Sequence, residues 1–112
     1  MAMTPEKKVK QRVVAQLKAL GAYYFYPATG GYGSSGVPDV VCCLDGRFIG
    51  IECKAGKGKT TALQDKNLRE IEAAGGVALV INEDNVDNLT GIIREWLDIL
   101  ELSRNKRTRT TD

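Results

Sequence analysis

Three residues that could form one chemical site, Asp39, Glu52 and Lys54, lie on either side of an Asp-Gly pair. An Asp-Gly pair between two apolar runs is the strongest short signal for a β-hairpin with a two-residue turn. If Asp45 and Gly46 are the central residues of that turn, the register places Asp39 opposite Glu52. Opposed residues point to one face with Cβ atoms about 5 Å apart, and Lys54, two residues after Glu52, points to that face too. The spacing therefore predicts that two carboxylates and an amine converge.

Two carboxylates at that separation require a nearby cation. Like charges opposed in a β-ladder destabilise it, and burying an unpaired carboxylate costs on the order of 2 kcal/mol or more. Lys54 alone could supply the charge, which would make the group a charge cluster at a sheet edge. The other interpretation is a divalent ion, because carboxylates and a backbone carbonyl, here that of Cys53, are hard ligands suited to Mg²⁺ or Mn²⁺. The chain has no histidine, so hydrolysis would have to use carboxylates, lysine or a metal.

The segments around the hairpin predict an α/β domain. Thr4 and Pro5 are typical of a helix start, and Gly21 is typical of a helix end. Both faces of the hairpin are largely apolar, so we expect helices to cover the sheet on both sides. We expect helices over 5–20, 61–74 and 89–100, and strands over 22–27, 39–44, 47–54 and 77–81. The order α-β-β-β-α-β-α forms one domain over residues 1–102, followed by a disordered basic tail over 103–112.

A glycine-rich segment, residues 29–36, leads directly into Asp39. Four glycines would let backbone N–H groups approach a phosphate closely, and Ser34 and Ser35 would add hydroxyl donors. A merely flexible connection is an equally good interpretation. Tyr32 has no apolar neighbours beside it and could stack on a base or wedge at a branch point.

Basic side chains cluster in two further segments that could contact phosphates. One is the loop over residues 55–59, and the other is the tail after Leu102, although tails of this kind are often only solvated. Their candidate phosphate contacts are Lys57, Lys59, Arg104, Lys106 and Arg107.

Composition excludes several classes of protein. The net charge of +2 is too small to establish a polyanionic partner. No apolar run approaches the roughly 20 residues of a membrane span, so we expect a cytoplasmic protein. The three cysteines include the neighbours Cys42 and Cys43 and fit neither a disulfide framework nor a zinc site. A P-loop at Gly58-Lys59-Thr60 is rejected because Cys53 stands where the motif requires glycine.

Pro38-Asp39, followed on the next strand by Glu52-Cys53-Lys54, resembles the signature of the PD-(D/E)XK nuclease superfamily. The flanking text is similar to the VRR-NUC family within it, from Ser34 to Asp39 and from Ile51 to Gly56, with Gln64 and then Ala74-Gly75-Gly76-Val77 downstream. The similarity covers roughly Thr4 to Trp96.

The resemblance implies a restriction-endonuclease-like core, with a small mixed sheet of about four strands flanked by helices. It implies that Asp39, Glu52 and the backbone carbonyl of Cys53 bind one or two Mg²⁺ or Mn²⁺ ions. Lys54 would then orient the attacking water or contact the scissile phosphate.

Two more residues have both a local role and one implied by the resemblance. Glu6 is a first-turn acid favoured by the helix dipole, whereas the resemblance makes it an acid that faces the metal site. Gln64 completes a capping box with Thr61, whereas the resemblance places it beside the metal site. Both roles stay open for each residue.

The implied function is metal-dependent, structure-specific cleavage of DNA. The resemblance is to small members of this family that act as homodimers and cut four-way (Holliday) junctions. Paired cuts across a two-fold junction require two active sites, which fits a homodimer. Flap, nicking or restriction-type cleavage is compatible with the same residues. A catalytically silent nucleic-acid-binding module is the other alternative, but Asp39, Glu52 and Lys54 fill every signature position and favour an active enzyme.

Overall fold

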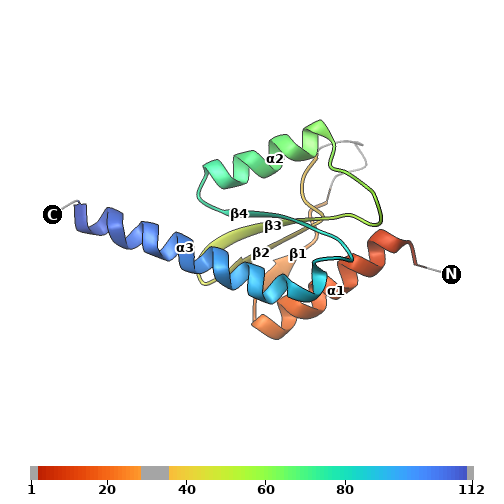
Figure 1. Cartoon of the computed structure of the whole chain (residues 1–112), viewed down its shortest axis with the longest axis horizontal. Helices are drawn as coiled ribbons and strands as arrows, with labels where there is room; N and C mark the ends of the chain where they lie inside the picture. Colours follow the sequence, from red (N-terminus) through yellow and green to blue (C-terminus); the bar gives the residue numbers. More distant parts are fainter. Residues whose placement is uncertain (1–2, 29–35, 111–112) are drawn as a thin grey trace.

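The computed structural model describes residues 3–28 and 36–110, with side chains up to Ser103 (Figure 1). Its order of elements confirms the predicted α-β-β-β-α-β-α class, with one short 3₁₀ helix added before the last helix. The elements are α1 (Pro5–Leu20), β1 (Tyr23–Phe25), β2 (Val40–Leu44), β3 (Arg47–Cys53), α2 (Ala62–Ala73), β4 (Val77–Ile81), η1 (Val86–Asn88) and α3 (Leu89–Thr110).

The four strands form one mixed sheet in the order β1-β2-β3-β4. β2 pairs with β1 and β3 in antiparallel fashion, and β4 runs parallel to β3. Asp45 and Gly46 have φ angles of 53° and 77°, the left-handed backbone that a tight two-residue hairpin turn requires. Leu44 therefore pairs with Arg47, which confirms the predicted register.

Helices cover the two faces of the sheet unequally. In Figure 1, α1 and α3 lie on one side of the sheet and α2 lies on the other. The hydrophobic core lies between the sheet and the α1/α3 layer, where branched aliphatic side chains pack with almost no exposure. Its largest fully buried side chains are Leu17, Ile49, Ile51, Ile81, Leu89 and Ile93.

Gln16 adds hydrogen bonds to the apolar contacts that hold the α1/α3 layer together. The side-chain nitrogen of Gln16 donates to the carbonyl of Val86, and its Oε1 accepts from both the N–H and the hydroxyl of Thr90 at 3.1 Å. Thr90 lies in the first turn of α3, where backbone N–H groups have no partner within the helix. Gln16 of α1 thus caps α3 from a distant part of the sequence.

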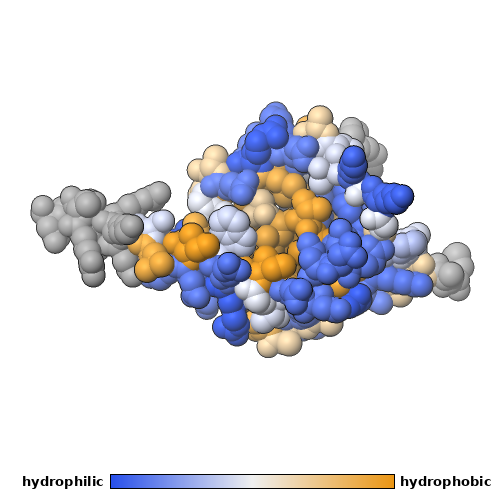
Figure 2. Space-filling model, viewed as in Figure 1, coloured by the Kyte–Doolittle hydropathy of each residue, from blue (hydrophilic) through white to orange (hydrophobic). Residues whose placement is uncertain are grey.

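The opposite face is less covered than the apolar sequence of the hairpin predicted. α2 packs on β3 and β4, and none of its residues is fully buried. Cys43 and Phe48 consequently lie exposed on the outer part of this face. Figure 2 also shows apolar residues on the surface between α2 and α3. The prediction that helices flank both faces of the sheet is confirmed, although α2 leaves Cys43 of β2 and Phe48 of β3 uncovered.

The last helix differs most from expectation. α3 runs to Thr110, so the backbone from Ser103 to Thr110 is helical where we expected a disordered tail. This segment contains neither proline nor glycine, and arginine and lysine are good helix formers that are favoured near a helix C-terminus. A helix that has already formed can therefore extend through it. None of the helices in the described part of the chain could cross a membrane.

Candidate active site

The backbone that carries Asp39 is held between α2 and β3. Gly36 has φ 70°, and a Cβ atom there would lie 2.7 Å from the backbone of the first turn of α2. Pro38 is buried, and a Cβ atom on Gly50 of β3 would lie 3.0 Å from its ring. Asp39 follows directly, and its Oδ2 accepts a hydrogen bond from the N–H of Cys53 at 2.8 Å. These close contacts place the Asp39 carboxylate at the end of β3.

Glu52 and Lys54 lie beside that carboxylate, as the hairpin register predicts. Glu52 lies one pair beyond the last ladder pair, which joins Val40 to Ile51, and it is only 3% exposed. Its Oε2 lies 3.5 Å from Nζ of Lys54, whose side chain is 11% exposed. The two acids and the amine therefore converge in a largely buried cluster.

The pKa of Glu52 is raised to about 7. Burial is the main cause, followed by the charge of Asp39 and a hydrogen bond between the two carboxyl groups, while Lys54 acts in the opposite direction. One lysine therefore does not compensate for two acids in this place. Within residues 3–28 and 36–110, no three His, Cys, Asp or Glu side chains gather as a metal-binding group. Two carboxylates with an unmet need for positive charge nevertheless fit a hard dication, with a backbone carbonyl as the third type of ligand.

The side-chain amide of Gln64 makes two hydrogen bonds, one through its oxygen and one through its nitrogen. Its Oε1 accepts from the backbone N–H of Thr61 at 2.9 Å. The backbone N–H of Gln64 donates to Oγ1 of Thr61 at 3.2 Å, and these two bonds form the capping box. Its Nε2 donates to Oε2 of Glu52 at 3.1 Å. The local and the site role left open by the sequence are therefore compatible, and the cap fixes the amide that contacts Glu52.

We call Asp39 and Glu52 the acid pair. A hollow of about 200 Å³ opens beside Asp39, between α1 and the end of β3. Glu6 lies on its wall, so the first helix does bring this acid to the side of the site where Asp39 lies. The role of Glu6 toward a metal stays a prediction. The hollow is lined by Thr4, Glu6, Lys7, Lys10, Asp39 and Cys53.

Comparison with solved structures places this arrangement in a known fold. The fold is that of a VRR_NUC domain protein. The two structures match with a TM-score of 0.63 and 20% sequence identity, over 88% of this chain and 92% of the other. No family model and no curated protein matches the sequence. The likeness establishes the VRR_NUC-like fold, and the chemistry of the site must be argued from the residues of this chain.

Sequence reasoning missed one lysine at the site of this VRR_NUC-like fold. Lys10 lines the hollow with Asp39, and its Nζ lies 4.4 Å from the ring centroid of Tyr26, within range of a cation–π contact. It stands one helical turn after Glu6, on the same side of α1. The four-residue spacing from Glu6 was the sequence signal that could have placed Lys10 at the site.

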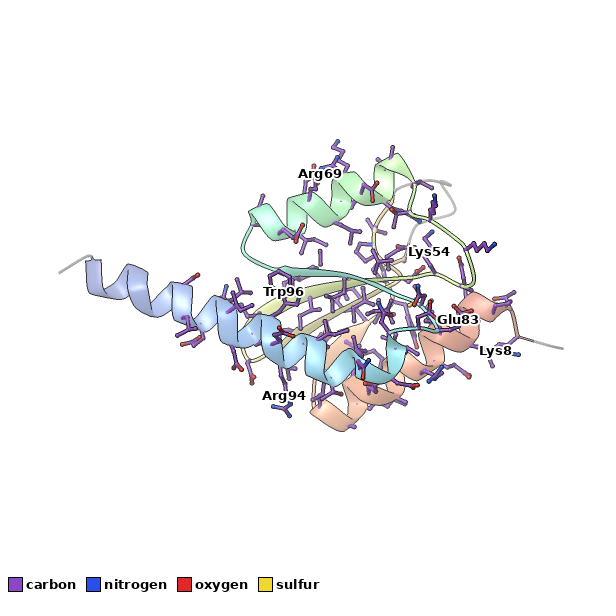
Figure 3. The ribbon with its side chains drawn as sticks, in the orientation of Figure 1. Lys8, Lys54, Arg69, Glu83, Arg94 and Trp96 are labelled. Carbon is purple, nitrogen blue, oxygen red and sulfur yellow. The ribbon has the colours of Figure 1, made fainter. Side chains whose placement is uncertain are left out.

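Glu83 is the second residue that sequence reasoning missed. Both of its carboxylate oxygens accept from the N–H of Gly56 at 3.0 Å. These bonds hold the loop that carries Lys57 and Lys59, which are both exposed. Hydrogen bonds from its own N–H and from that of Gly56 lower the pKa of Glu83. Figure 3 shows Glu83 and Lys54 at the same end of the VRR_NUC-like sheet.

Some of the predicted nucleic-acid contacts cannot be placed. Tyr32, Ser34 and Ser35 lie outside the described residues, as do the side chains of Arg104, Lys106 and Arg107.

Proposed function

We propose that this chain is a divalent-metal-dependent DNA endonuclease of the VRR-NUC family. The observation that carries the proposal is the buried cluster in which Asp39, Glu52 and Lys54 converge while Gln64 donates to Glu52. The same three residues that resemble the nuclease signature meet at one end of a sheet whose fold is shared with a VRR_NUC domain protein.

Each side chain has a role that follows from its surroundings. Asp39, Glu52 and the carbonyl of Cys53 would hold Mg²⁺ or Mn²⁺, which lowers the pKa of water and stabilises charge on a phosphate. Lys54 is held close to Glu52 and so can orient a water molecule or a phosphate oxygen beside it. Gln64 keeps the Glu52 carboxylate oriented, and Glu6 would act from the wall of the hollow.

The substrate that we propose is branched DNA, above all the four-way junction. No separate DNA-binding motif that reads base edges is present in the described part of the chain, so we expect recognition of DNA shape and phosphates rather than sequence. Lys57, Lys59 and the basic end of α3 would supply salt-dependent affinity. Removing the residues after Leu102 should therefore reduce the slope of log Kd against log salt concentration, and an unchanged slope would dismiss the contribution of that segment.

Two coordinated cuts across a junction suggest that the enzyme acts as a homodimer. Exposed apolar side chains on α3 are one candidate contact surface: Trp96, Ile99 and Leu102 are 39%, 47% and 64% exposed. The aromatic side chains of β1 are the other, with Tyr23 73% exposed. Sedimentation of the full chain and of an Ile99→Glu/Leu102→Glu variant would decide between monomer and dimer and between the two surfaces.

Cleavage of labelled four-way, flap, nicked and linear DNA tests the proposed activity. With Mg²⁺ or Mn²⁺ we expect cutting of the four-way junction, and with EDTA we expect none. Asp39→Asn and Glu52→Gln should abolish cleavage while binding persists or tightens, because a negative charge near phosphate is removed. Asp84→Asn and Glu95→Gln make the same chemical changes at exposed positions and should leave cleavage unchanged.

Three outcomes would reject the assignment. These are cutting that ignores EDTA, full activity of Glu52→Gln, or tight binding of DNA that is never cut with either metal. The last result would favour the silent binding module. Preferred cutting of flap or nicked DNA would instead keep the nuclease and replace the junction as its substrate.

A further inference from the structure

Lys54 and Lys10, two lysines at the site, differ in whether their positive charge is paired with a carboxylate. Nζ of Lys54 lies 3.5 Å from Glu52, and its side chain is almost fully buried, so much of its charge is balanced within the protein. Lys10 forms no ion pair with any carboxylate in the described part of the chain. Its ammonium group lies over the ring of Tyr26. Lys10 therefore keeps its charge available at the mouth of the site.

The position of Lys10 places that charge in the hollow beside Asp39. It lines the same hollow as Asp39 and Cys53, and the hollow of about 200 Å³ is large enough for a phosphate group. Lys10 comes from α1, whereas Asp39 and Cys53 lie directly before β2 and at the end of β3. Lys10 and the Asp39 carboxylate therefore face one shared space.

The ring of Tyr26 holds the Lys10 side chain in position without cancelling its positive charge. A cation 4.4 Å from a ring centroid is attracted to the face of the ring, but it keeps ammonium protons free for other acceptors. A long lysine side chain that is already positioned loses less conformational freedom when a ligand binds. The pair thus resembles a prepared anion site next to two carboxylates that would otherwise repel phosphate.

We propose that Lys10, held by Tyr26, binds a phosphate of the DNA strand next to the bond that is cut. This phosphate lies on the α1 side of the acid pair, and the strand continues past Lys54 toward the loop with Lys57 and Lys59. The inference rests on the proposed nuclease function, and it assigns the first helix a direct part in binding the substrate.

A matched pair of lysines on one helix tests this assignment. Lys8 is exposed, does not line the hollow and lies about 200° around α1 from Lys10. In Figure 3 it lies at the start of α1, well apart from Lys54. Lys10→Gln and Lys8→Gln remove the same charge from neighbouring positions. Lys10→Arg keeps the charge, Tyr26→Phe keeps the ring, and Tyr26→Leu removes it.

Binding of a four-way junction is measured in EDTA over a range of salt concentrations, and cleavage is measured separately with Mg²⁺. Lys10→Gln should weaken binding about tenfold, the effect of one charge-assisted hydrogen bond. It should also reduce the slope of log Kd against log salt by about 0.7 to 0.9. Lys10→Arg and Tyr26→Phe should behave nearly as the unchanged protein, and Tyr26→Leu should fall between Lys10→Gln and the unchanged protein.

The outcomes separate this inference from the proposed function. If the unchanged protein cuts DNA and Lys10→Gln binds like Lys8→Gln, the Lys10 site is overturned and the nuclease stands. If the protein binds the junction but never cuts it, the binding experiment still decides the role of Lys10. A chain that binds no DNA overturns both. Thermal unfolding of every variant checks that each one is folded.

Discussion

The side-chain nitrogen of Gln64 lies 3.1 Å from Oε2 of Glu52 and donates a hydrogen bond to it. The oxygen of the same amide accepts from the N–H of Thr61, at the start of α2. The capping box therefore fixes the direction of the amide nitrogen. In this way the start of α2 orients the Glu52 carboxylate. A residue type chosen only for capping could equally be glutamate, which lacks the donor.

Two substitutions should separate these functions of Gln64. Gln64→Glu keeps an oxygen for the N–H of Thr61 but replaces the donor to Glu52 with a like charge. Thr61→Ala removes the hydroxyl of the cap and leaves Gln64 itself unchanged. We expect Thr61→Ala to lower the free energy of unfolding by about 1 kcal/mol with little loss of cleavage. Gln64→Glu should lower cleavage strongly. Equal activity of the two variants would show that Gln64 only caps the helix.

The raised pKa of Glu52 predicts an unusual dependence of stability on pH. The folded protein holds the Glu52 proton up to about pH 7, whereas the unfolded chain releases it near the ordinary value of 4.5. The stabilising contribution is therefore fully present below about pH 4.5 and is lost as the pH rises to about 7. Its size is at most about 3 to 4 kcal/mol, because the pKa rises from 4.5 to about 7 and each pKa unit corresponds to about 1.4 kcal/mol.

Urea unfolding in EDTA between pH 4.5 and 8 measures this contribution. Glu52→Gln removes the titrating group. As the pH rises, the unchanged protein should lose stability through Glu52 and the variant should not, so the free energy of unfolding of the variant should increase relative to that of the unchanged protein. Mg²⁺ should reduce that difference at pH 8 if Glu52 binds the ion. A constant difference across the range would show that Glu52 titrates normally.

Glu83 should control the mobility of the loop that carries Lys57 and Lys59. Its two oxygens share the N–H of Gly56, which has φ 57°. Without this contact the loop has fewer bonds to the rest of the domain. We expect Glu83→Ala to speed trypsin cleavage after Lys57 and Lys59, while the exposed acid Glu72, changed to alanine, should have no effect. Unchanged cleavage of Glu83→Ala would show that other contacts hold the loop.

Local sequence signals were sufficient for the parts of the site that lie on adjacent elements. The turn at Asp45-Gly46 sets the hairpin register through backbone geometry alone, and the register brings Asp39, Glu52 and Lys54 together. Gln64 could be placed because a capping box depends on residues three positions apart. These relationships need no knowledge of how distant segments pack.

Contacts between distant segments could not be derived in the same way. Lys10 reaches the site only because α1 crosses the end of β3, and its partner Tyr26 follows a separate strand. Glu83 bonds to Gly56, 27 residues away, although Glu83 reads as part of an ordinary turn. Phe48 is likewise exposed because α2 does not extend over it, and no pattern in the hairpin sequence predicts this.

Arg47 joins the hairpin to the turn after α2 and to the middle of α3, and it should therefore matter for stability. Its Nη1 donates to the carbonyl of Gly75, after α2, at 3.0 Å, and its Nη2 donates to that of Leu100, in α3, at 3.2 Å. Hydrogen bonds from a charged donor are stronger than neutral ones, so we expect Arg47→Ala to lower the free energy of unfolding by about 1 to 2 kcal/mol.

Arg94→Ala is the control for Arg47, because Arg94 is exposed on α3 and in Figure 3 points away from the sheet. It should change the free energy of unfolding by no more than about 0.5 kcal/mol. Since Arg47 lies far along β3 from Glu52, Arg47→Ala should leave the salt dependence of DNA binding unchanged. Equal destabilisation by the two variants in chemical unfolding would mean that the two hydrogen bonds of Arg47 add no net stability.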